Sequence, residues 1–245
     1  MKFLYLANIR FPTEKAHGLQ IAQMCEAFAQ GGAQVTLLVA RRHNSAEMIA
    51  ADPFVYYGVA RNFELASVPC LDLIGRWSSL DRIAFLLQTF TYLVAALASL
   101  WIKADLRAEV YYSRDLFTVL ALGLFLPRRA RWYEVHQSSK SRIGVALQGW
   151  AVRHVAGVVC VTSRLAQEMR ALGAQQVMVE HDGFRLERFA GLPERAEARH
   201  RLGLPADSFI VGYTGRLQTL NQSKGIDVLV EALGSLRDPE IALCL

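Results

Sequence analysis

Short hydrophobic runs alternate with longer amphipathic segments along most of the chain. The runs that predict strands are Lys2–Asn8, Gln34–Ala40, Glu64–Pro69, Glu109–Ser113, Arg131–His136, Val158–Thr162 and Gln176–Glu180. Helical patterns lie between them, at Leu19–Gln30, Ser78–Lys103, Leu116–Phe125, Ser141–His154 and Arg164–Leu172. Several strands are continuously apolar, as strands covered on both faces must be. The alternation therefore predicts an α/β fold with a doubly wound, Rossmann-like parallel sheet.

The periodicity breaks after Asp182–Gly183, where a segment rich in Arg and Glu follows. The strand pattern resumes at Phe209–Tyr213, and a helix at Lys224–Arg237 and a run at Ile241–Leu243 complete about one βαβ unit. A lone βαβ unit cannot cover both faces of its own sheet. We therefore expect three parts: a complete domain (1–183), a linker (184–207) and the start of a second, incomplete Rossmann-like domain (208–245).

One segment, Ile83–Ile102, is twenty residues without a charge, which is long enough to span a bilayer. Polar residues nevertheless form one stripe on a helix through this region, at Asp81, Gln88, Tyr92, Ser99 and Lys103. The stripe favours a helix that does not span, and that either packs into the domain or lies on a membrane.

Basic residues follow this segment around the fifth predicted strand: Arg128, Arg129, Arg131, Lys140 and Arg142. An apolar helix with basic residues on the same side would attach reversibly to an anionic bilayer. The alternative is a helix buried against the sheet, with the basic side chains solvated. The sequence leaves both open.

The composition indicates a globular protein with an anionic partner. Of the 245 residues, 53% are apolar and 20% charged, and the formal net charge is +5. Candidate partners are phosphorylated small molecules, anionic lipid headgroups and nucleic acid. The positive excess is mild, and no motif of a nucleic-acid-binding fold accompanies it, so we expect no nucleic-acid partner.

Cysteine usage and the N-terminal pattern predict a cytoplasmic protein. Four cysteines are far apart, and neither C-x-x-C nor H-E-x-x-H occurs, which argues against structural zinc and a redox pair. The chain begins directly with a strand-like run and shows no signal cleavage site.

Glycine and cationic residues cluster after the strand Phe209–Tyr213. It ends at Thr214-Gly215-Arg216, and Lys224-Gly225 then opens an amphipathic segment. A tight glycine turn that presents Arg and Lys to one crevice suits a phosphorylated ligand. Two cations there could neutralise a departing diphosphate without a metal. The alternative is two solvated surface charges.

Two positions in the first domain are further candidates. Gly18 ends the loop after the first strand and precedes a helix, so its backbone N–H could face a phosphate, or it is only a turn glycine. His136 ends the fifth strand, where its imidazole could meet a ligand or simply cap the next segment. We assign no role to the remaining histidines: His17, His43, His154, His181 and His200.

Taken together, these residues resemble the GT-B retaining glycosyltransferases of group 4. The resemblance runs in the expected order over nearly the whole chain. It comprises the loop bearing Gly18, Glu134–Gln137, Val161–Ser163 before a helix, Asp182–Phe184, Gly215–Arg216 and Lys224–Asp227.

The resemblance implies transfer of a sugar from a nucleotide-sugar donor, with retention and without a metal or other cofactor. It implies that the backbone of Gly18 approaches the donor diphosphate and that His136 contacts the donor sugar as a catalytic residue. Gly215, Arg216 and Lys224 would bind the diphosphate, the two cations stabilising it as it leaves. The implied acceptor is a cell-envelope glycan, a lipid-linked glycan or a polysaccharide, at the inner face of the membrane.

The sequence departs from the family pattern in three ways. Asp182 stands where asparagine is common, and Gln218–Gln222 lengthens the gap between Arg216 and Lys224. The E-x7-E element of the donor domain would lie beyond residue 245, so we expect a chain truncated early in that domain. Two alternatives stay open: a GT-B nucleotide-sugar epimerase, whose catalytic carboxylates the sequence does not place, and a non-catalytic membrane-docking or scaffold domain.

Overall fold

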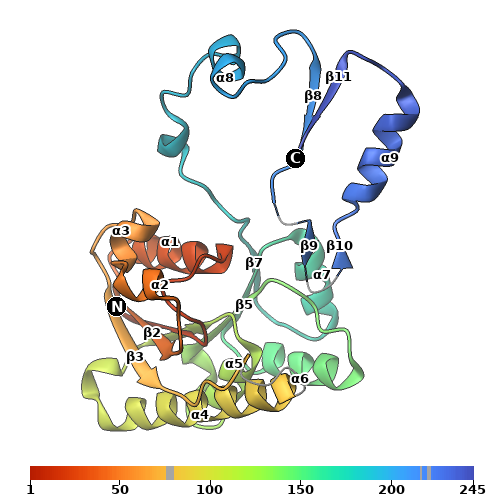
Figure 1. Cartoon of the computed structure of the whole chain (residues 1–245). Coiled ribbons are helices and arrows are strands. Elements are labelled where there is room, and N and C mark those ends of the chain that lie inside the picture. Colours follow the sequence, from red (N-terminus) through yellow and green to blue (C-terminus); the bar gives the residue numbers. More distant parts are fainter. Residues whose placement is uncertain (76–79, 216, 220–221) are drawn as a thin grey trace. The chain divides into compact units, whose positions relative to one another are not determined.

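The computed structural model describes residues 1–75, 80–215, 217–219 and 222–245. The chain divides into two compact units, Met1–Gly183 and Phe184–Leu245 (Figure 1).

The first unit is built on a seven-stranded sheet in the order β3-β2-β1-β4-β5-β6-β7. Every pair of neighbours in it is parallel. The strands are β1 (Lys2–Ala7), β2 (Gln34–Arg41), β3 (Glu64–Pro69), β4 (Val110–Ser113), β5 (Arg131–Val135), β6 (Gly157–Cys160) and β7 (Val177–Val179). The chain builds outward from β1 to β3, then returns to place β4 on the other side of β1. This confirms the predicted doubly wound parallel sheet.

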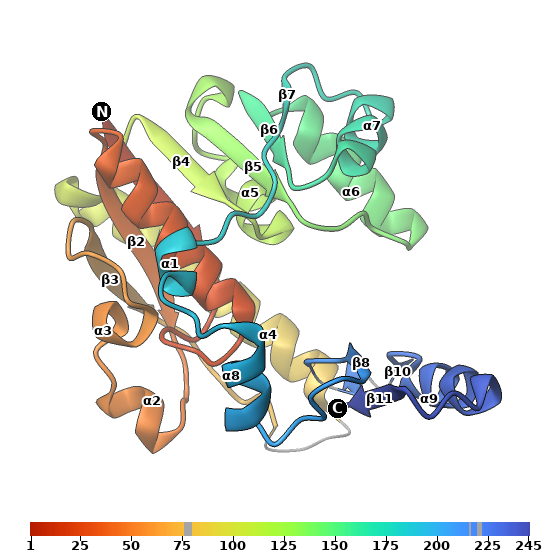
Figure 2. The ribbon, with the colours of Figure 1, turned by 90° about the horizontal axis from the view of Figure 1, so that it is seen from above.

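Five longer helices cover the sheet: α1 (Ala16–Gln30), α4 (Asp81–Ile102), α5 (Leu116–Leu122), α6 (Arg142–Arg153) and α7 (Ser163–Ala171). Side chains of successive residues of β1 lie on opposite faces of the sheet, because side chains alternate along a strand. Phe3 and Tyr5 pack in a core with α1, whereas Leu4 and Leu6 pack in a core with α4. Figure 1 shows these two helices on opposite faces of the sheet, and Figure 2 looks onto the α1 face.

Two short helices lie where the sequence predicts no element: α2 (Ala46–Ala50) and α3 (Pro53–Tyr57). Five residues are too few to show a helical period, and side-chain caps define these helices instead. Ser45 accepts a hydrogen bond from the N–H of Met48, and Asp52 accepts from two N–H groups at the start of α3. Tyr57, the last residue of α3, reaches the loop before α1, where its hydroxyl bonds both the N–H and the carbonyl of Thr13.

Helix α4 turns the middle of its polar stripe toward the sheet, whereas Lys103 at the end of the stripe is exposed. Gln88 and Tyr92 are fully buried, and the Gln88 amide donates a hydrogen bond to Asn8 Oδ1 over 2.7 Å. The opposite side is apolar and exposed, with Trp101 70% and Ile102 81% exposed. Among the described residues, this is the helix with the length and hydropathy to cross a membrane.

The expectation of a basic surface is wrong for one residue, Arg131. Arg131 is only 5% exposed, because it opens β5 inside the sheet, so it cannot contribute to a basic surface. The other four, Arg128, Arg129, Lys140 and Arg142, are exposed.

The second unit contains one parallel βαβ arrangement. Strands β8 (Phe209–Gly212) and β11 (Ile241–Cys244) pair in parallel, and α9 (Ile226–Leu236) connects them. The described residues of α9 include none that is buried. A 3-10 turn (Leu186–Phe189) and α8 (Arg195–Arg201) precede β8. Where a loop is expected at Gln218–Gln222, β9 (Gln218–Thr219) pairs antiparallel with β10 (Gln222–Ser223).

Candidate functional site

The candidate site of the first unit is a cavity of about 290 Å³ at the carboxyl ends of the central strands. The loop after β1, the segment after β4 and the residue after β5 all contribute to it. Strands are added to the sheet in one direction from β1 to β3 and in the other direction from β4 to β7, and β1 and β4 are neighbours where this order reverses. Open α/β sheets bind their ligands at such a switch point. The lining residues are Ala16, His17, Leu19, Gln20, Gln23, Arg114, His136, Asp182 and Gly183.

A buried carboxylate, Glu134, holds two of the residues that line this cavity, Gln20 and His136. It lies on β5 and is 2% exposed. Its Oε1 accepts a hydrogen bond from the Gln20 amide over 2.7 Å and lies 2.6 Å from His136 Nε2. Its Oε2 accepts one from the Tyr5 hydroxyl over 2.8 Å. The carboxylate therefore has a partner on each oxygen, as a buried charge requires.

Opposing effects set the pKa of Glu134. Burial raises it, but the hydrogen bond and charge of His136, followed by the Tyr5 hydroxyl and Arg114, outweigh burial and hold this pKa below its usual value. The ionised carboxylate in turn raises the pKa of Tyr5, whose burial contributes most to that shift. Glu134 is thus a carboxylate that holds the hydroxyl of Tyr5 protonated.

His136 is oriented by this carboxylate. Since Oε1 of the ionised Glu134 accepts, Nε2 of His136 carries a proton, and Nδ1 has no hydrogen-bond partner among the described residues. The side chain is partly exposed at the cavity. A ring fixed through one nitrogen presents the other to a ligand in a defined orientation.

Gln20 connects Glu134 to Arg114. The Gln20 amide donates to the carboxylate, and its carbonyl accepts from Arg114 Nη1 over 2.9 Å. Arg114 follows β4 directly and brings a positive charge to the cavity. Burial, followed by the charge of Arg114, lowers the pKa of His17 on the same wall. The wall therefore combines a cation with a neutral imidazole.

Sequence reasoning missed four members of this network: Tyr5, Gln20, Arg114 and Glu134. Two of them leave a signal in the sequence. Glu134 is an acid between the apolar residues Tyr133 and Val135 of a strand, where an ionisable residue is rarely buried without a partner. Arg114 stands at the carboxyl end of a strand, the ligand-binding edge of the sheet. Tyr5 and Gln20 leave no comparable signal.

Gly18 lies in the first turn of α1 and is buried. Its N–H donates to the Lys15 carbonyl over 2.9 Å. A β-carbon there would overlap the Tyr57 hydroxyl and would lie 2.6 Å from Thr13 Cγ2, so close packing alone explains the glycine. A role of its backbone toward a diphosphate stays a prediction.

The remaining predicted residues belong to the second unit. Gly215 has φ +146°, a conformation that side chains rarely adopt. Lys224 is exposed, and its N–H donates to the Leu217 carbonyl over 3.1 Å. Gly225, next to it, has φ +77° and caps α9. Arg216 lies outside the described residues.

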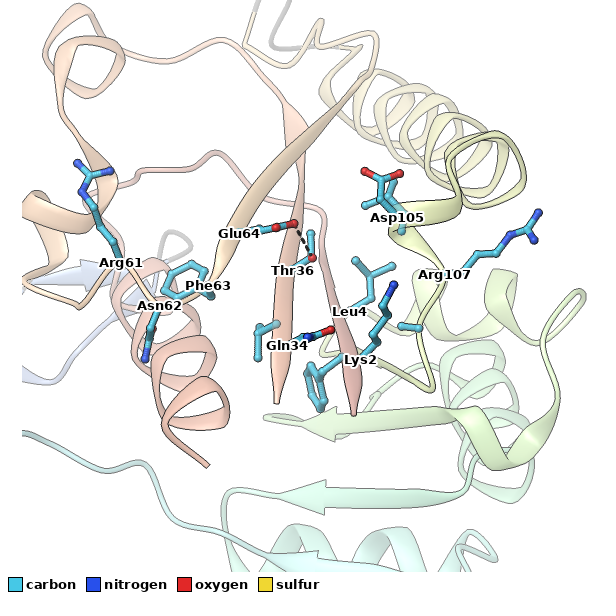
Figure 3. Close-up of a pocket in the computed structure, with 14 residues that line it drawn as sticks. Lys2, Leu4, Gln34, Thr36, Arg61, Asn62, Phe63, Glu64, Asp105 and Arg107 are labelled. Carbon is cyan, nitrogen blue, oxygen red and sulfur yellow. Dashed lines mark hydrogen bonds between the residues drawn. The ribbon is translucent and has the colours of Figure 1, made fainter. Parts of the chain in front are cut away.

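A larger hollow of about 490 Å³ lies at the amino-terminal edge of the same sheet (Figure 3). Lys2 and Gln34 open β1 and β2 there, and Glu64 opens β3. It contains both positive and negative side chains and none of the predicted site residues. Ligand chemistry in open α/β sheets is found at the opposite edge.

Curated relatives match a part of the chain, and no family model matches it. A D-inositol 3-phosphate glycosyltransferase of Streptomyces bingchenggensis is 41% identical over 86 residues, which is 34% of this chain and 18% of the relative. The "Putative teichuronic acid biosynthesis glycosyltransferase TuaC" of Bacillus subtilis is 39% identical over 89 residues, 36% of this chain and 22% of the relative. The match thus spans about a fifth of each relative.

Solved structures match almost the entire chain. Sucrose-phosphate synthase of Thermosynechococcus elongatus aligns with a TM-score of 0.69 at 16% identity, covering 99% of this chain and 61% of its own. The lipopolysaccharide outer core galactosyltransferase WaaB aligns with a TM-score of 0.57 at 13% identity, and the alignment covers 99% of this chain and 60% of the WaaB chain. The chain has the fold of these glycosyltransferases. At such identities the likeness speaks for the fold alone.

Proposed function

We propose that the protein is a glycosyltransferase that moves a sugar from a nucleotide-sugar donor to an acceptor. The observation that carries the proposal is the cavity at the switch point, where the buried Glu134 orients His136 toward a ligand. The matched segments of two curated glycosyltransferases support it. So do two solved structures of the same fold, one of Medicago truncatula UGT71G1 with UDP-glucose and one of TcCGT1 with UDP.

In this proposal the reaction is retaining and independent of a metal, with no further cofactor. The bond between the anomeric carbon and the diphosphate oxygen breaks, the acceptor hydroxyl oxygen forms the new bond to that carbon, and its proton passes to the departing diphosphate. Arg216 and Lys224 bind the diphosphate and neutralise the charge that develops on it. His136 contacts the donor sugar, and the backbone of Gly18 and Gly215 approaches the diphosphate.

We assign a separate role to each part of the chain. Residues 1–183 hold the acceptor, residues 184–207 link, and residues 208–245 belong to the nucleotide-sugar-binding domain. The positive φ angles of Gly215 (+146°) and Gly225 (+77°) support the last assignment, because turns of this kind are typical of backbone sites for phosphate groups.

The proposed acceptor is a glycan of the cell envelope or a lipid-linked glycan, reached from the cytoplasmic face of the membrane. The teichuronic acid relative supports the first part. Exposed apolar side chains of α4 support the second: Ile83, Leu86, Phe90, Val94, Trp101 and Ile102. Leu124 and Phe125 extend this apolar surface beside the end of the helix, since the rings of Trp101 and Phe125 meet edge to face at 6.4 Å.

Basic residues border the apolar surface of α4. Lys103 follows Ile102, and Arg128 and Arg129 follow Phe125 within a few residues; all three are exposed. Apolar area next to positive charge favours reversible attachment to an anionic bilayer. The same surface also serves the second candidate function, a membrane-docking domain without catalysis.

A donor panel tests the proposal on a version of the protein with a complete second Rossmann-like domain. We expect one class of nucleotide sugar to release its nucleotide diphosphate, faster when an acceptor is added, and residues 1–245 alone to turn over poorly. An epimerised sugar nucleotide would indicate the epimerase instead. No reaction with any donor, together with vesicle binding, would indicate the docking domain.

A further inference from the structure

A third hollow, of about 420 Å³, lies at the carboxyl ends of β2 and β3. Its polar lining comprises Arg10, Lys15, Arg42, His43, Asn44 and Asp72. Lys15 directly precedes Ala16 and His17, which line the cavity of the candidate site. One loop therefore borders both hollows, and we call the 420 Å³ hollow the basic pocket.

Hydrogen bonds, three of them to the buried Asp72, fix the walls of the basic pocket. Arg42 holds Asp72 through two contacts, Nε to Oδ2 over 3.2 Å and Nη2 to Oδ1 over 3.3 Å. The Asp72 side chain is 6% exposed and also accepts from the His43 N–H over 3.0 Å. The Asn44 amide donates to the Pro12 carbonyl over 2.7 Å, which ties this wall to the loop after β1. A pocket held in this way loses little freedom on binding.

The charges of the basic pocket do not balance. Its lining carries three cations, Arg10, Lys15 and Arg42, and one carboxylate, Asp72, which Arg42 already neutralises. The Lys15 ammonium has no partner among the described residues. Arg10 contacts Glu14 over 3.6 Å in an exposed pair, and such pairs contribute little. Arg10 and Lys15 are thus available to an anion.

The positive field of this loop extends to the neighbouring cavity. After burial and Arg114, Lys15 is the next cause of the lowered pKa of His17, and Arg10 contributes in the same direction. An anionic group in the basic pocket would therefore lie beside the proposed donor site. The hydroxyl that such a molecule carries could then reach the sugar.

We propose that the basic pocket binds a phosphate group of the acceptor, so that the enzyme selects phosphorylated acceptors over neutral ones. Guanidinium and ammonium groups with a nearby amide and imidazole are the donors that phosphate oxygens take. The proposal deepens the proposed function, on which it rests. The phosphate could belong to a soluble sugar phosphate or to a lipid headgroup, and the two share this chemistry.

Isothermal titration of residues 1–245 with glucose 6-phosphate and with glucose tests the pocket. We expect glucose 6-phosphate to bind, with inorganic phosphate as a competitor, and glucose not to bind. Arg10→Gln and Lys15→Gln should each weaken binding by roughly tenfold, the loss of one charge-assisted contact. Arg41→Gln is the matched control, because Arg41 is an exposed arginine next in sequence to Arg42 that does not line the pocket.

A second arm identifies the source of the phosphate. Phosphatidylcholine vesicles with and without phosphatidic acid are co-sedimented with the same proteins. Binding to phosphatidic acid that Arg10→Gln and Lys15→Gln weaken but Arg41→Gln does not would assign the pocket to a lipid headgroup. The proposal is overturned if neither probe binds, or if the pocket variants and the control behave alike.

The proposed function is followed separately by titrating UDP on the same set of proteins and by the donor panel. Binding of sugar phosphate in a protein that uses no nucleotide sugar would support the pocket and contradict the glycosyltransferase. Nucleotide-sugar turnover in a protein whose pocket variants match the Arg41→Gln control would do the reverse.

Discussion

The two units of the chain build their candidate binding features in different ways. In Met1–Gly183 the site depends on side chains, because the buried Glu134 is bonded to Tyr5, Gln20 and His136. In Phe184–Leu245 it depends on backbone conformation, because Gly215 and Gly225 have positive φ and Gly225 directly follows the exposed Lys224. Glycine motifs can be recognised from sequence, whereas a buried polar network must be seen in the fold.

The largest expected effect is the loss of the buried carboxylate. Glu134→Ala leaves three buried or half-buried donors without an acceptor, so the free energy of unfolding should fall by about 3 to 5 kcal/mol. Urea unfolding of the first unit measures this change. Glu180→Gln, on an exposed carboxylate, is the control. A loss below 1 kcal/mol would mean that water replaces the network.

The same carboxylate predicts a pH dependence. Its pKa is lower in the folded state, so its contribution is present above the usual value of 4.5 and is lost as pH falls toward the folded pKa. Glu134→Gln should flatten stability between pH 5 and 3, a window that follows from the downward shift. Equal slopes in wild type and variant would contradict a lowered pKa.

The second unit should respond in activity and not in stability. With a complete donor domain, Arg216→Ala and Lys224→Ala should each lower kcat/KM by about 100-fold, about 3 kcal/mol of transition-state stabilisation. Their urea midpoints should stay at the wild-type value, because Lys224 is exposed. Steady-state kinetics on these variants and on Arg195→Ala, another exposed cation of this unit, decide the matter. Near-normal activity of both Arg216→Ala and Lys224→Ala would show that these residues form only a solvated turn and do not bind the diphosphate.

A pair of glycines compares the units directly. Gly18→Ala should destabilise the first unit by about 1 to 3 kcal/mol, because the new β-carbon overlaps Tyr57 and Thr13. Gly234→Ala should stabilise α9 by up to about 1 kcal/mol, because nothing lies within 4 Å of its β-carbon position and alanine favours a helix. Hydrogen exchange reports each unit separately. Effects of the same sign would show that the two units are packed alike.

The smallest effect concerns the exposed face of α4. Trp101→Ser should weaken binding to anionic vesicles by a factor of a few, and added salt should weaken it further. Phe209→Ser removes an equally exposed aromatic residue of the second unit and is the control. Equal recovery of wild type with neutral and anionic vesicles would remove the electrostatic part of the docking proposal.

The sequence predicts the sheet well, for a physical reason. Strands β1 to β7 lie close to their predicted ranges. Inner strands such as β1 and β6 are almost continuously buried, because both faces of the sheet are covered there, and this forces apolar runs. Helices α2 and α3 are missed because their ends are set by the single caps Ser45 and Asp52. Arg131 is misjudged because an arginine is seldom buried, and only the packing of β5 shows that this one is.

The candidate site is only partly predictable. His136 is found because it ends a strand, and it lines the cavity. Glu134, which orients His136, accepts a hydrogen bond from Gln20, and these two residues are 114 positions apart, so no local spacing links them. Arg114 and Asp182 reach the same cavity from other segments of the chain. Which residues meet at the cavity depends on the order of the strands in the sheet. The sequence pattern predicts a doubly wound parallel sheet but not this order.

The inward polar stripe of α4 has a consequence for how the chain can meet a bilayer. Leaving the sheet to span the membrane would expose the Gln88 amide to lipid and remove its hydrogen bond to Asn8. An amide placed in hydrocarbon without a partner costs several kcal/mol. A single glutamine therefore sets how deep the helix can go. Gln88→Leu would remove this restraint and leave a segment suited to act as a membrane anchor, so the restraint could be gained or lost by one substitution.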